Sequence, residues 1–83
     1  MSIESQLLSL TRKYCTSKIT FDELTTWVQD REERWASLPG GDAAKILADT
    51  IMLAAYEVWA GARNEASARK LIADSATAPA SSA

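Results

Sequence analysis

The sequence contains no histidine and only one cysteine, Cys15. Histidine is the commonest general base, and both Cys–His nucleophile pairs and Cys/His zinc sites need the two residue types together. A single cysteine forms no internal disulfide, so the fold does not depend on an oxidising compartment. These absences disfavour the main catalytic and metal-binding classes. We therefore expect a non-enzymatic protein with no cofactor and no metal site.

Basic charge and long apolar runs are also scarce. The formal net charge is −2 at pH 7, whereas a nucleic-acid-binding surface needs a basic patch. The apolar segment 46–60 contains Asp49 and Glu57 and is too short to span a bilayer. The first four residues lack the basic region and the apolar run of a signal peptide. We expect a cytoplasmic protein that binds neither nucleic acid directly nor a membrane.

A helix over about residues 43–60 is predicted to form the centre of the fold. At 100° per residue, its apolar side chains cover an arc of roughly 160°, and a helix this apolar needs neighbours on several sides. The arc contains Leu47, Ile51, Ala54 and Val58, widened by Ala44, Ala48, Met52, Ala55 and Trp59. Three large apolar residues fall on the other side of the helix, namely Ile46, Leu53 and Tyr56.

The clearest local signal is a capping box at Thr20 to Glu23, which starts a second helix at Phe21. In a continuous helix over 21–36, an apolar arc contains both Trp27 and Trp35. Arg31 is four residues from each tryptophan, so its guanidinium is expected to lie over an indole ring in a structural cation–π contact.

The segment Pro39-Gly40-Gly41 is the strongest break in the chain, and Asp42 is suited to cap the helix that follows. The glycine pair does not belong to a phosphate-binding loop, because the GxxxxGK[ST] pattern is absent. Gly61 leaves two readings open: it ends the central helix as the residue after the cap, or the helix runs through it unbroken. Asn64 is expected to cap the last helix.

These signals predict an all-α fold, a small antiparallel bundle of three long helices (about 3–15, 21–36 and 43–60) and a short fourth (about 64–74). Residues 1–74 are expected to form a single helical domain. Residues 75–83, rich in serine and alanine, are expected to form a disordered tail. The predicted core contains Leu7, Leu10, Tyr14, Leu24, Val28, Leu47, Ile51, Ala54 and Val58.

Two surfaces are candidate binding sites. Acidic side chains of the second helix lie within about 100° of one another, and they form either a solvated face or a contact surface for a basic partner. These residues are Asp22, Glu23, Asp30 and Glu33. The alternative surface is the apolar group Ile46, Leu53 and Tyr56, which favours self-association or partner docking if the last helix leaves it uncovered.

The segment Ser17-Lys18-Ile19-Thr20-Phe21-Asp22-Glu23-Leu24, which leads to Trp27, Arg31 and Trp35, resembles the small helical immunity proteins of the colicin D type. Related members of that family are partners of contact-dependent growth-inhibition toxins. The resemblance covers roughly residues 5–60. The C-terminal part differs, because members have a longer acidic segment before the last helix, whereas Arg63, Arg69 and Lys70 make it basic here.

The resemblance implies a stoichiometric inhibitor. Such a protein binds a nuclease toxin domain, often one that cuts tRNA, and covers the basic active-site cleft with acidic side chains in place of RNA phosphates. A second hypothesis is a non-enzymatic interaction or assembly module, such as a phage or bacterial adaptor that forms a homodimer. A DNA-binding helix-turn-helix protein is disfavoured, because neither inner helix has the basic and amide side chains of a recognition helix.

Overall fold

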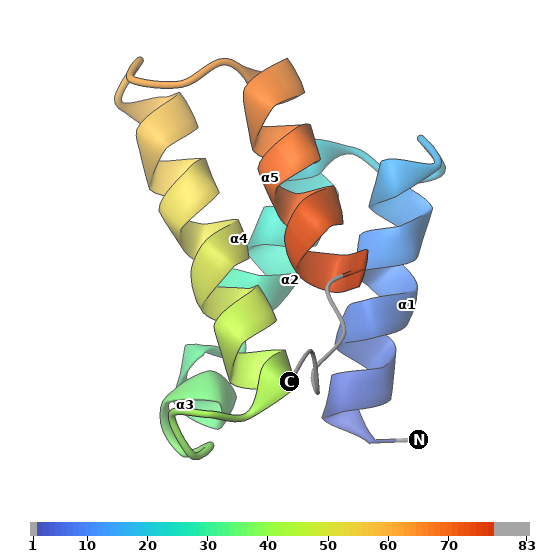
Figure 1. Ribbon diagram of the computed structural model, residues 1–83, viewed down its shortest axis with the longest axis vertical. Coiled ribbons are helices and arrows are strands. Elements are labelled where there is room, and N and C mark those ends of the chain that lie inside the picture. The colour runs from blue at the N-terminus through green and yellow to red at the C-terminus, as the bar shows by residue number, and fades with distance from the viewer. Residues whose placement is uncertain (1, 78–83) are drawn as a thin grey trace.

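In the computed structural model, residues 2–77 are described, and they form five helices with no strand in that range (Figure 1). The predicted all-α class is therefore confirmed. In Figure 1, α1 and α4 form opposite sides of the molecule, with α2 and α5 between them. The helices are α1 (Ile3–Cys15), α2 (Phe21–Gln29), α3 (Glu32–Ala36), α4 (Ala43–Trp59) and α5 (Glu65–Thr77).

Side-chain caps start the helices where the sequence predicts them. The capping box of α2 is complete: the Glu23 amide donates to Thr20 Oγ1, and the Thr20 amide donates to Glu23 Oε1, both over 3.1 Å. Asp42 caps α4 by accepting from the Ala44 amide at 2.8 Å. The Asn64 side chain likewise accepts a bond at the start of α5. Each of these bonds satisfies a backbone donor that the first helical turn leaves unpaired.

Gly61 ends the central helix, which decides between the two readings of this position. Its φ of 77° is in the left-handed region, which glycine adopts without a steric penalty. The Gly61 amide donates to the Val58 carbonyl at 3.1 Å, and the Ala62 amide donates to the Glu57 carbonyl at 2.8 Å. This pair of bonds is a Schellman motif. The chain therefore turns back after α4 and places α5 alongside it.

The predicted single helix over 21–36 is wrong, because the chain breaks between α2 and α3. No proline or glycine lies at the break; side chains satisfy the backbone groups that it releases. The Trp35 indole N–H donates to the Val28 carbonyl at 2.8 Å, and Arg31 Nη1 donates to the Trp27 carbonyl at 3.0 Å. The break turns α3 so that Trp35, only 4% exposed, joins the core.

The core is centred on α4, which packs against each of the other four helices. Seven of the nine predicted core residues are buried, whereas Leu10 and Val58 are only partly buried against the core. Trp59, placed on the buried arc of α4 by its helical angle, is instead half exposed. The seven confirmed residues are Leu7, Tyr14, Leu24, Val28, Leu47, Ile51 and Ala54.

The last helix is longer than predicted. With 13 residues, α5 is as long as α1, and it continues past residue 74 to Thr77. Its residues Ala68 and Ile72 are fully buried, while Ser75 and Ala76 are partly buried. Residues 75–77 are thus helical and not part of a tail. The rest of the predicted tail, 78–83, lies outside the described residues.

Arg69 joins α5 to the end of α1. Its Nη1 donates to the Tyr14 carbonyl and to the Ser17 hydroxyl, both over 3.1 Å. Its guanidinium also lies over the Tyr14 ring, 4.6 Å from the centroid. The Tyr14 carbonyl also accepts from the Ser17 amide at 3.0 Å, so Arg69 is its second donor, and the cation complements the dipole at the end of α1.

Candidate functional site

The four acidic candidates are all exposed, but they do not form one straight stripe. Asp22, Glu23 and Asp30 line an open hollow on α2. Glu33 lies on α3, beyond the break, and is not among the residues that line this hollow. The predicted alignment of all four on one helix is therefore wrong. The acidic surface, defined as these four residues, extends from α2 across the break to α3.

Most of this acidic surface is not neutralised within the protein. None of the three ion pairs found among residues 2–77 includes Asp22, Asp30 or Glu33. Glu23 is held by its role in the capping box. Three carboxylates therefore remain available to a basic partner.

Arg31 is the one cationic residue that lines this hollow, and its guanidinium packs against Trp27. The Arg31 guanidinium lies over the Trp27 ring, 4.3 Å from the centroid, as predicted from the spacing. Its hydrogen bond to the Trp27 carbonyl fixes it further. Arg31 therefore supports the break between α2 and α3 and leaves the neighbouring carboxylates uncompensated.

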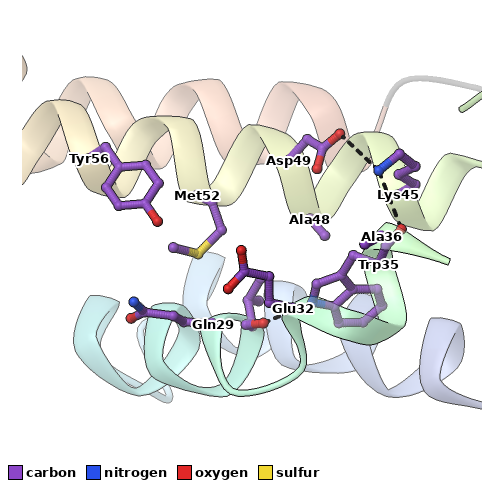
Figure 2. Close-up of a pocket in the computed structure, with 10 residues that line it drawn as sticks. Gln29, Glu32, Trp35, Ala36, Lys45, Ala48, Asp49, Met52 and Tyr56 are labelled. Atoms are coloured by element: carbon purple, nitrogen blue, oxygen red, sulfur yellow. Dashed lines mark hydrogen bonds and ion pairs between the residues drawn. The ribbon is translucent and has the colours of Figure 1, made fainter. Parts of the chain in front are cut away.

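A pocket of about 210 Å³ lies between α4 and the α2–α3 pair (Figure 2). Its walls are mainly apolar and include Val28, Trp35 and Met52. Figure 2 shows Glu32 pointing from α3 toward α4, at the middle of the pocket. The sequence did not single out Glu32 as a site residue, because the pocket forms only where α4 packs against α2 and α3.

Lys45 is the basic residue that lines this pocket, and it already forms an ion pair within the protein. Its Nζ lies 3.7 Å from Asp49 Oδ2 and donates to the Trp35 carbonyl at 3.3 Å. Lys45 thereby closes the C-terminal end of α3 onto α4. The pocket combines apolar walls with the Glu32 carboxylate, an arrangement suited to binding an apolar or cationic side chain.

The alternative surface is a group of four exposed apolar side chains on α4, namely Ile46, Leu53, Tyr56 and Trp59. Their exposed fractions are 49%, 56%, 55% and 50%, so α5 leaves the three predicted residues uncovered. Trp59 adds to this group, with its ring edge-on to Tyr56 and the centroids 5.6 Å apart. The signal that could have found it is its position three residues after Tyr56, on the next turn of the same face.

Two groups beneath the surface have altered acidity. Burial raises the pKa of the Tyr14 phenol; the Glu65 carboxylate adds to this, while the Arg69 guanidinium opposes it. The Tyr14 hydroxyl has no hydrogen-bond partner in the part of the chain that the structure describes. Burial also raises the pKa of the half-buried Cys15 thiol, against the influence of Arg69, and a raised pKa makes a thiol a poorer nucleophile at neutral pH.

Residues 2–77 contain no cluster of three or more His, Cys, Asp or Glu side chains placed to hold a metal ion. No helix in this range has the length and apolar character needed to cross a membrane. In comparisons with known proteins, no family model, curated protein or solved structure matches this chain.

Proposed function

We propose that this protein is a stoichiometric, non-enzymatic inhibitor that binds a basic nuclease toxin domain in the cytoplasm. The observation that carries the proposal is the set of exposed carboxylates Asp22, Asp30 and Glu33, none of which has an ion-pair partner among residues 2–77. The resemblance of residues 5–60 to immunity proteins supports the same function. No cofactor is needed for such a role.

The physical basis is charge complementarity. A nuclease cleft that binds RNA phosphates carries lysine and arginine side chains, and carboxylates placed on it take over the ionic contacts of the phosphates. Carboxylates without internal partners give up no ion pair when they bind. Asp30 lies at the end of α2 and Glu33 on α3, so the two carboxylates reach the partner from either side of the break.

The test uses the protein encoded immediately upstream, because immunity proteins are usually encoded beside their toxins. That protein is purified, and calorimetry measures its binding while cleavage of a tRNA substrate measures its activity. We expect a one-to-one complex and loss of cleavage at equimolar inhibitor. Absence of binding together with undiminished cleavage by a nuclease encoded there contradicts the proposal.

Charge reversal locates the contact surface. Glu33→Lys is expected to weaken the complex by at least about tenfold, because a buried cationic partner then faces a like charge. Glu4→Lys is the matched control, since it makes the same change at an exposed glutamate of α1. Equal affinities of the two variants exclude the acidic surface as the contact.

A second candidate function, an assembly module, is favoured by one observation. Four large apolar side chains of α4 are about half exposed, and exposed apolar patches mark interaction sites in soluble proteins. This function uses a different surface from the inhibitor proposal, so the two are tested separately.

A further inference from the structure

The pocket between α4 and the α2–α3 pair has the size needed for one side chain. Its volume is about 210 Å³, whereas pockets for drug-sized ligands and cofactors have about 300–1,000 Å³. A nucleotide or a larger cofactor therefore does not fit. A protein cavity of about 150 Å³ already holds a benzene ring, so the pocket has room for one large side chain.

The residues that line the pocket form an apolar floor and a polar mouth. Val28, Trp35 and Ala48 are buried and provide the floor. Glu32 is exposed, so its carboxylate lies where the pocket meets solvent. Figure 2 shows this carboxylate directed toward Met52 of α4. A group that enters the pocket therefore contacts the Glu32 carboxylate with one part and apolar side chains with the rest.

One negative charge of the pocket has no matching cation. The charged residues that line it are Glu32, Lys45 and Asp49. Lys45 Nζ lies 3.7 Å from Asp49 Oδ2, whereas none of the three ion pairs among residues 2–77 includes Glu32. An anionic group in the pocket is repelled by this carboxylate. An apolar group removes water from the carboxylate and leaves it without a counterion, which is unfavourable.

A cation with an apolar stem avoids both costs, and arginine is the side chain that fits best. Its stem packs on apolar surface, and its guanidinium donates two parallel hydrogen bonds to a carboxylate. The guanidinium also lies favourably over aromatic rings, which Trp35 and Tyr56 provide in the pocket wall. The lysine ammonium is more strongly hydrated, so burying it costs more.

The position of the pocket connects it to the acidic surface. Glu32 directly precedes Glu33 on α3, and Glu33 is part of the acidic surface. A partner that lies on the acidic surface therefore also lies next to the pocket. We propose that an arginine side chain of the basic toxin domain inserts into this pocket, with its guanidinium on Glu32 and its stem against Met52. The identity of this partner rests on the proposed function.

The first experiment tests the pocket without the toxin. The isotope-labelled full chain is titrated with N-acetyl-arginine N-methylamide, and NMR follows the backbone amide shifts. We expect saturable shifts at Glu32, Trp35 and Met52, with a dissociation constant on the order of 1 mM. The citrulline analogue has nearly the same shape and no charge, and it should bind at least about tenfold more weakly. This comparison needs only the wild-type chain, so it does not depend on the folding of any variant.

The second experiment uses the complex with the protein encoded immediately upstream. Glu32→Gln is expected to weaken this complex by at least about tenfold, because the inserted guanidinium then has no counterion. Glu4→Gln makes the same change at an exposed glutamate of α1 and should leave the affinity unchanged. Circular dichroism checks that both variants are folded, as expected for conservative changes at exposed positions.

The outcomes separate this inference from the inhibitor proposal. If the upstream protein binds the wild type and Glu32→Gln equally well, the inhibitor proposal stands and the arginine pocket is wrong. If it binds neither, the inhibitor proposal fails, and the NMR titration alone decides the pocket. Shifts with the arginine probe that the citrulline analogue does not produce support a site for an arginine side chain. No shifts, or equal shifts with both probes, overturn it.

Discussion

The Trp35 indole donates a hydrogen bond over 2.8 Å to the Val28 carbonyl, seven residues earlier in the chain. In an unbroken helix that carbonyl would accept from the amide of residue 32. The indole instead satisfies it, and the Arg31 amide also reaches it at 3.1 Å. The Val28 carbonyl is therefore hydrogen-bonded even though the helix breaks after it. The break places Glu32 and Glu33 on a separate helix, α3.

Trp35→Phe is expected to lower the free energy of unfolding by about 1–3 kcal/mol, since it removes the donor and leaves a small void. Trp59→Phe is the matched control and should change it by less than about 0.5 kcal/mol, because that indole is half exposed. Urea titrations of both variants measure the two changes. Similar losses for the two would show that the Val28 contact is unimportant.

Ile51→Ala is expected to lower the free energy of unfolding by about 2–5 kcal/mol, because Ile51 is fully buried in α4 and its truncation leaves a cavity. A domain of this size has about 5–8 kcal/mol in total, so the variant should be barely folded. Thr20→Ala should cost only about 1 kcal/mol through the lost cap of α2. Denaturant titration compares them; a larger loss for Thr20→Ala would contradict the placing of the core.

Tyr14→Phe is expected to raise the free energy of unfolding at pH 7 by about 1 kcal/mol, because it removes a buried hydroxyl without a hydrogen-bond partner. Fluorescence-monitored urea titration measures the change. A destabilised variant would show that the hydroxyl has a favourable role in the folded protein.

The same residue predicts a loss of stability in alkali. The pKa of Tyr14 is raised above its ordinary value of 10.0, so the unfolded chain releases this proton first as the pH increases. The free energy of unfolding that protonated Tyr14 contributes is complete below pH 10.0, and it decreases as the pH rises toward the pKa of Tyr14 in the folded protein. Urea titrations at neutral pH and at a pH above 10.0 should show a smaller loss for Tyr14→Phe than for the wild type. Equal losses would assign the alkaline effect to other groups, such as Cys15, whose pKa is also raised.

Association with a basic toxin domain is expected to slow as salt is added, because exposed charges are screened beyond about 10 Å at 0.1 M. Stopped-flow mixing of the wild type at low and high salt measures the association rate constant. The double variant Asp30→Lys, Glu33→Lys should have a slower rate and a weaker salt dependence, with its melting temperature nearly unchanged because both positions are exposed. A salt-independent wild-type rate would exclude steering by the acidic surface.

Local chemistry in the sequence determined the starts and stops of most helices. The Thr20 capping box and the Asp42 cap each act over a few neighbouring residues, so short patterns were enough to place them. Gly61 had two readings in the sequence, and its left-handed φ in the structure made it the end of α4. The period of apolar residues also identified α4 as the central helix and placed Ile46, Leu53 and Tyr56 on its outer face.

Only the tertiary structure decided the break in the predicted second helix and the direction of its last turn. The bonds that replace the lost helical ones come from Arg31 and Trp35, and Trp35 makes its bond while packing into the core. A helical wheel assumes an unbroken helix, so it wrongly placed Glu33 on one helix with Asp22. The pocket beside Glu32 was missed because it forms only where α4 packs against α2 and α3. Trp59 was misplaced for a related reason: helical angle gives a residue's direction, but the neighbouring helices decide which directions are covered.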